Sequence, residues 1–135
     1  MNILFVADPL ESFKTYKDTT FSMMREAQRR GHRVAACEPR HLVWRSGDVV
    51  RSTVRNITLT GTDDEWFRES SEPVKALRDF DAIVMRKDPP FDSEYLYATH
   101  LLEAAERQGA KVFNKPRALR DNNEKLAILR FPQFI

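Results

Sequence analysis

The segment Phe80-Asp-Ala-Ile-Val-Met-Arg-Lys-Asp-Pro-Pro-Phe-Asp92 passes from a short apolar run directly into a polar turn that two prolines stiffen. An apolar run of this length is typical of a strand buried on both faces of a parallel sheet. We therefore predict a core strand over Phe80–Met85, followed by a loop at its carboxyl end. Open α/β sheets bind their ligands at that edge. The segment thus predicts both the fold class and the position of a site.

The first part of the chain reads as a β-α-β unit. Ile3–Ala7 is a second apolar run, stopped by an Asp-Pro step, and Arg33–Glu38 resembles a further strand. Between them, Asp18 is placed to cap a helix whose apolar residues recur at helical spacing, and Gly31 is placed just past its end. Two strands joined in this way are expected to be parallel, with a right-handed crossover.

The pattern continues after the Phe80–Asp92 segment. Asp92 can cap a second helix with one apolar face, and Gly109 is placed to end it. Lys111–Phe113 then predicts a fourth strand. Pro116 suits the first turn of a short helix, where the missing N–H is tolerated.

The middle of the chain departs from this alternation. Residues 42–60 carry a turn between two stretches of imperfect alternation, which indicates a β-hairpin. A short helix is predicted to begin in residues 63–67, and residues 73–79 are predicted to be helical or irregular. Trp44 and Trp66 are expected to complete the core. We therefore expect an α/β, Rossmann-like fold, with a mainly parallel sheet, helices on both faces and a β-hairpin excursion around residues 42–60.

Composition narrows the class of protein. The 135 residues are 41% hydrophobic and 31% charged, as in a globular domain, and the net charge is +2. Because the charges are well mixed, no basic stripe indicates nucleic-acid binding. The apolar amino terminus is too short for a signal peptide or a membrane span. Cys37, the single cysteine, is expected to be a buried filler and fits a cytoplasmic location.

The loop after the third strand holds the densest group of candidate binding residues. Arg86 offers a planar fork and Lys87 a point charge for a carboxylate, while Asp88 can accept from an α-amino group. Asp18 is a further substrate-binding candidate, although a helix cap is the simpler explanation of this residue. From the residues alone, a surface ion pair worth under about 1 kcal/mol explains the loop as well as a binding site does.

Several kinds of site are not indicated. The four glycines form no dinucleotide or P-loop fingerprint, and the three histidines lack metal-ligand spacing. We therefore expect neither a metal site nor a catalytic side chain in this chain.

Taken in order, a set of motifs resembles the amino-terminal domain of bacterial glutathione synthetases, which belong to the ATP-grasp superfamily. The most specific of them is the string Met85–Asp92. The others are Asp8-Pro9, Lys17-Asp18, Glu26–Gly31, Glu65–Phe67, Tyr97–Thr99 and Asn114–Leu126.

The resemblance implies that residues 1–121 form a substrate domain and that residues 122–135 begin a truncated ATP-grasp domain. The family joins γ-glutamylcysteine to glycine through an acyl phosphate, with ATP and Mg²⁺. The resemblance also implies that Lys125 reaches ATP and that Arg86, Lys87 and Asp88 line the peptide side of the cleft. The phosphate-covering loop and the magnesium-binding acids are expected downstream, so the isolated chain is expected to be inactive. Homo-oligomerisation is also expected by resemblance.

Two alternatives come from other classes of protein. A phospho-receiver domain fits the length, the position of Asp8 and the Lys115-Pro116 step, but it requires paired acids after the first strand. A non-catalytic interaction module could use the aromatic residues near Trp44 and Trp66 as anchors.

Overall fold

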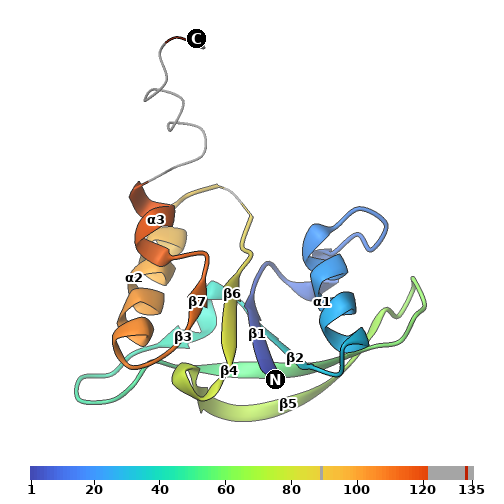
Figure 1. Cartoon of the computed structure of the whole chain (residues 1–135), viewed down its shortest axis with the longest axis horizontal. Coiled ribbons are helices and arrows are strands. Elements are labelled where there is room, and N and C mark those ends of the chain that lie inside the picture. Colours follow the sequence, from blue (N-terminus) through green and yellow to red (C-terminus); the bar gives the residue numbers. More distant parts are fainter. Residues whose placement is uncertain (89, 122–132, 134–135) are drawn as a thin grey trace.

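The computed structural model describes residues 1–88, 90–121 and 133, and in this part of the chain it has one sheet with helices on both faces (Figure 1). The strands and α-helices follow one another as β1 (Asn2–Val6), α1 (Thr19–Arg29), β2 (Arg33–Cys37), β3 (Leu42–Val43), β4 (Arg51–Leu59), β5 (Phe67–Ala76), β6 (Ala82–Met85), α2 (Ser93–Arg107), β7 (Val112–Phe113) and α3 (Pro116–Asp121). Short 3-10 turns lie at η1 (Leu10–Ser12), η2 (Pro39–His41) and η3 (Leu77–Asp79).

The parallel half of the sheet confirms the predicted α/β class. Strands β2, β1, β6 and β7 lie side by side in that order, and each neighbouring pair is parallel. All four expected core strands are present, and their ends lie within two residues of the predicted ends. The carboxyl ends of β1 and β6 meet at one edge, since Val6 pairs with Met85.

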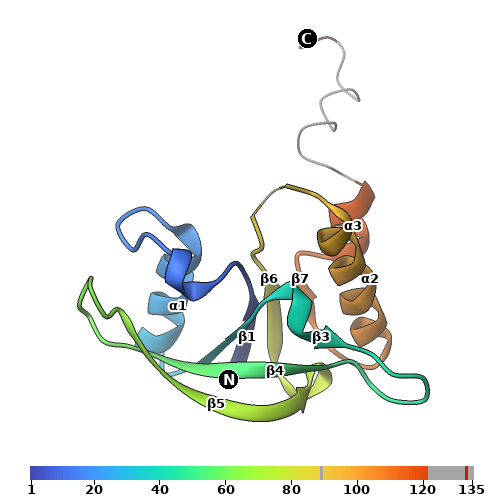
Figure 2. The same ribbon diagram turned by 180° about the vertical axis from the view of Figure 1, so that it is seen from behind.

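The central strand β1 is covered on both faces because its side chains alternate between two cores. Leu4 and Val6 pack into the core under α2 and α3, together with Leu102 of α2. Phe5 faces the other way and packs with Met24 of α1. Figures 1 and 2 show α1 on one side of the sheet and α2 with α3 on the other.

The predicted helix caps are confirmed. The Asp18 carboxylate accepts hydrogen bonds from the backbone N–H groups of Thr20 and Phe21 at the start of α1. The Asp92 carboxylate accepts from the Tyr95 N–H at the start of α2. These bonds satisfy donors that the first helical turn leaves free.

The excursion after β2 is longer than predicted. The expected hairpin is present as β3 and β4, which pair antiparallel. The predicted helix at residues 63–67 is wrong, because residues 62–65 turn the chain and Phe67 starts β5, which runs antiparallel along β4. The helical alternative for residues 73–79 is also wrong up to Ala76, since β5 continues to that residue and only η3 follows.

The aromatic side chains explain why this segment is a strand. Trp66 is 6% exposed, stacks on Phe13 at 5.4 Å between ring centroids, and contacts Phe21 of α1 edge-on. The strand tolerates Pro73 because β5 is an edge strand with an irregular register near that residue. Trp44 corrects the expectation that both tryptophans are core residues, because it is 49% exposed and its indole N–H donates to the Asp48 carbonyl.

Candidate functional site

The candidate loop begins at the carboxyl edge shared by β1 and β6. The backbone N–H of Arg86 donates to the Val6 carbonyl oxygen at 2.7 Å, so the loop leaves the sheet directly beside the end of β1. The sequence-based prediction placed Arg86, Lys87 and Asp88 at this edge, and the structure confirms that position. Their role in binding stays a prediction.

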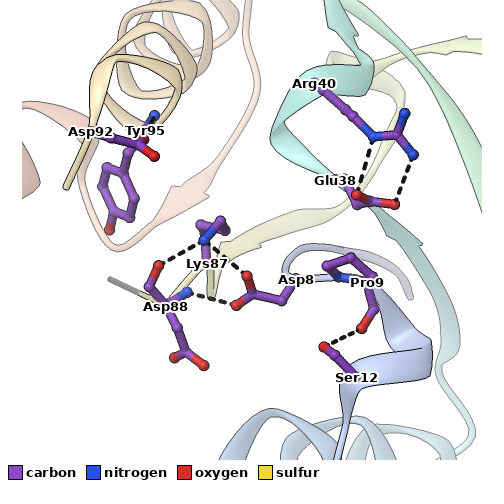
Figure 3. Close-up of polar contacts among 9 residues, drawn as sticks. All are labelled: Asp8, Pro9, Ser12, Glu38, Arg40, Lys87, Asp88, Asp92 and Tyr95. Carbon is purple, nitrogen blue, oxygen red and sulfur yellow. Dashed lines mark hydrogen bonds and ion pairs between the residues drawn. The ribbon is translucent and has the colours of Figure 1, made fainter. Parts of the chain in front are cut away.

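Asp8, the second residue after β1, fixes this loop. One carboxylate oxygen lies 2.9 Å from Lys87 Nζ, and the other accepts the backbone N–H of Asp88 at 2.9 Å. Lys87 Nζ also donates to the Asp88 carbonyl at 2.9 Å, so the ammonium lies between two oxygen atoms (Figure 3). Because the Lys87 and Asp8 side chains are only 19% and 23% exposed, this ion pair is better shielded from water than an ordinary surface pair.

The electrostatics of Lys87 follow from this arrangement. Burial by itself lowers the pKa of the Lys87 ammonium, but the hydrogen bond to Asp8 and the charges of Asp8, Asp92 and Asp88 outweigh burial and raise the pKa overall. Lys87 is therefore a permanent cation at neutral pH, and much of its charge is already compensated by Asp8.

Arg86 is held differently. Its Nε–H donates to the Thr20 hydroxyl at 3.2 Å, and Thr20 is a buried residue in the first turn of α1. Within residues 1–88 and 90–121, no carboxylate forms an ion pair with Arg86. The fixed Nε leaves the two terminal nitrogens of the guanidinium to recognise a carboxylate, for which a bidentate fork is well suited.

Asp18 and Arg86 meet at Thr20. The Asp18 carboxylate accepts the Thr20 backbone N–H at 2.9 Å, while the Thr20 side chain accepts from Arg86. Asp18 therefore has a clear capping role, and it also lies next to the residue that positions Arg86. The structure brings the four described candidates together, whereas Lys125 lies outside the described residues.

Asp88 completes the group with an exposed carboxylate. Figure 3 shows this carboxylate pointing away from the Lys87 ammonium, whose contact is with the Asp88 backbone carbonyl. The next fixed point is the start of α2, where Asp92 caps the helix and the Phe91 and Tyr95 rings lie 4.6 Å apart. A fork for a carboxylate and an exposed acceptor for an ammonium are together suited to an amino acid or a small peptide.

The contact of Asp8 with the loop was not predicted from the sequence. In the sequence, Asp8 was recognised as part of the Asp-Pro step that stops the first strand, and not as the partner of Lys87. The available signal was that both residues follow parallel strands. Nearby, Glu38 follows β2 and its carboxylate accepts from Arg40, which adds another ion pair to the same edge (Figure 3).

Other candidate chemistries find no support in the described part of the chain. Cys37 is buried as predicted, and burial raises the pKa of its thiol to about 12, so it is not a nucleophile at neutral pH. Among the described residues, no three His, Cys, Asp or Glu side chains gather as metal ligands. No described helix is both long enough and apolar enough to cross a membrane.

Comparison with known families decides between the alternatives. The family model described as "Prokaryotic glutathione synthetase, N-terminal domain" matches residues 1–120. The chain belongs to this family. The match favours the glutathione synthetase interpretation over a receiver domain or an unrelated interaction module, and it confirms the resemblance found in the motifs.

Individual glutathione synthetases agree with this assignment. The chain is 53% identical over 134 residues to that of Ralstonia nicotianae, an alignment that covers 99% of this chain and 41% of the relative. It is 52% identical over 137 residues to that of Neisseria meningitidis serogroup A, covering 99% and 43%. It is 45% identical over 128 residues to that of Vibrio parahaemolyticus, covering 95% and 40%. The chain thus spans about two fifths of the length of the curated relatives it matches.

Proposed function

We propose that this chain is the substrate-binding part of a glutathione synthetase that joins γ-glutamylcysteine to glycine with ATP. Residues 1–121 form the substrate domain in this proposal, and residues 122–135 begin the ATP-grasp region. The observation that supports it best is the fixed loop Arg86–Asp88 at the carboxyl edge of β1 and β6. The loop lies within residues 1–120, which match the amino-terminal domain of the prokaryotic glutathione synthetase family.

The proposed reaction requires the loop to bind and position the dipeptide. The cysteinyl carboxylate of the dipeptide is phosphorylated by ATP, and the glycine amine then attacks the acyl carbon, releasing phosphate and a proton. In this chain, Arg86 would bind a dipeptide carboxylate through its terminal nitrogens, and Asp88 would accept from an ammonium group. Asp8 would hold the loop, while Asp18 would fix the start of α1. Positioning of this kind accounts for a large share of catalysis in group transfer, and no side chain here needs to move a proton.

ATP and Mg²⁺ would be held mainly by a downstream region. The described residues offer no cluster of carboxylates for Mg²⁺, and a magnesium ion needs several oxygen ligands. Lys125 is the one residue of this chain that we propose for ATP binding. The proposal also includes a cytoplasmic location and a homo-oligomeric state. Light scattering of the longer form would test the oligomeric state.

Turnover by two forms of the protein tests the proposal. The 135-residue chain and a natural form that continues past Ile135 each receive γ-glutamylcysteine, glycine and magnesium-ATP, and ADP release is measured. We expect ADP release only by the longer form, and only when γ-glutamylcysteine and glycine are both present. Turnover by the short chain would contradict the division of labour, and no turnover by the longer form would contradict the assigned reaction.

A further inference from the structure

A second concave region lies at the opposite edge of the sheet from the candidate site. This hollow has a volume of about 390 Å³, and its lining includes Asn2 and Arg33, where β1 and β2 begin, Asn56 and Thr58 of β4, and Lys75 of β5. Its volume is in the range of sites for small molecules. It is far too small to enclose a folded partner.

The alternation of side chains explains why this part of the sheet is open. Leu4 and Ala35 belong to the core under α2, so Asn2 and Arg33, two residues earlier on their strands, share that face. Asn56 pairs with Ala35 across β2 and β4 and therefore faces the same way. The hollow is thus a polar extension of the α2 face at the amino ends of β1 and β2, and Gln28 of α1 also lines it.

The charged side chains that line the hollow are positive. The cations Arg33 and Lys75 line it, and within the part of the chain that the structure describes no acidic residue does. The Asp81 carboxylate accepts the backbone N–H of the lining residue Asn2 at 2.6 Å, so one negative charge lies beside the hollow. A concave surface whose charged lining residues are cations concentrates positive potential.

The remaining lining provides a fixed frame. Lys75 Nζ lies 4.6 Å from the centroid of the buried Phe80 ring, which holds the lysine over an apolar surface. Gln28 is fixed by hydrogen bonds in both directions with the Leu59 backbone. Within the described part of the chain, the side chains of Asn56 and Thr58 form no hydrogen bond, so they are free to bind a ligand oxygen.

We propose that this hollow binds a small organic anion bearing carboxylate or phosphate groups, through Arg33 and Lys75, with Asn56 and Thr58 as hydrogen-bond donors. The site is separate from the Arg86–Asp88 loop and does not depend on the proposed reaction. Because the two regions lie at opposite ends of β1, binding in the hollow would leave the loop accessible.

Titration of the 135-residue chain with citrate and, separately, with pyrophosphate tests this site by amide NMR and calorimetry at low salt. We expect at least one of the two to saturate, with the shifts centred on the amides of Asn56 and Thr58. The double variant Arg33→Gln/Lys75→Gln should weaken binding at least about 10-fold, whereas Arg45→Gln/Lys111→Gln, which removes the same charge elsewhere, should change it by less than about twofold.

The two probes separate the possible ligand groups, since binding of one alone identifies the group that the hollow recognises. No saturable shift with either probe up to about 10 mM would overturn the proposal, because two correctly placed cations give measurable affinity below that concentration. An equal loss in both double variants would overturn it too, since this result would indicate non-specific attraction. Shifts confined to the Arg86–Asp88 edge would also overturn it.

Discussion

Replacing Arg86 by methionine in the form that continues past Ile135 is expected to lower kcat/KM for γ-glutamylcysteine by about 100-fold, which corresponds to about 2.7 kcal/mol of lost transition-state binding. The reason is geometric. Thr20 holds Nε, and no described carboxylate competes for the terminal nitrogens, so Arg86 is the cation best prepared to accept the dipeptide carboxylate.

Two further variants sharpen this test. Arg86→Lys keeps the charge but loses the bidentate fork, and we expect it to recover only a small part of the activity. Arg45→Met, at an exposed residue in the connection between β3 and β4, should leave kcat/KM unchanged. Full activity in Arg86→Met, or full rescue by lysine, would contradict a role in forked recognition of a carboxylate. Steady-state kinetics at varied dipeptide concentration provide the readout.

Replacing Asp8 by asparagine is the second substitution with a large expected effect. It removes the charge that compensates Lys87 and weakens the acceptor for the Asp88 N–H. Since the pair is mostly shielded from water, we expect the free energy of unfolding to fall by about 1–3 kcal/mol. We also expect kcat/KM of the longer form to fall about 10-fold, because the loop is less well positioned.

A double-mutant cycle separates positioning from general destabilisation. Asp8→Asn/Lys87→Met should cost less than the sum of the single substitutions, because both act on the same pair. Denaturant unfolding measures the stability term, and kinetics below the unfolding transition measure the activity term. Asp64→Asn, in the exposed turn before β5, is the matched control and should change neither. Additive losses in the cycle would show that Asp8 does not act through Lys87.

The parallel strands could be predicted because burial on both faces leaves a clear mark in the sequence. Ile3–Ala7 and Ala82–Met85 are continuous apolar runs, as expected of strands buried on both faces. Strand β5 has no such mark. Its charged and serine-rich sequence, with a proline, suits an edge strand that is defined by its pairing with β4. Local sequence could not show that pairing.

The site was predictable in position but not in its contacts. The strand-end rule pointed to Arg86–Asp88, because polar residues there follow a buried strand. The ion pair of Lys87 with Asp8 depends on the register of β1 against β6, where Val6 faces Met85. That register is a property of the folded sheet, as is the contact of Arg86 with Thr20 of α1. The two neighbouring cations therefore have different partners, Asp8 for Lys87 and Thr20 for Arg86, which the sequence did not show.

The central claim is that the Arg86–Asp88 loop, held by Asp8, receives the dipeptide. A crystal structure of the longer form with γ-glutamylcysteine tests it most directly. We predict a dipeptide carboxylate within hydrogen-bond distance of the terminal nitrogens of Arg86, with the contact between Asp8 and Lys87 preserved. A dipeptide bound elsewhere, with Arg86 making no contact to it, would contradict the claim.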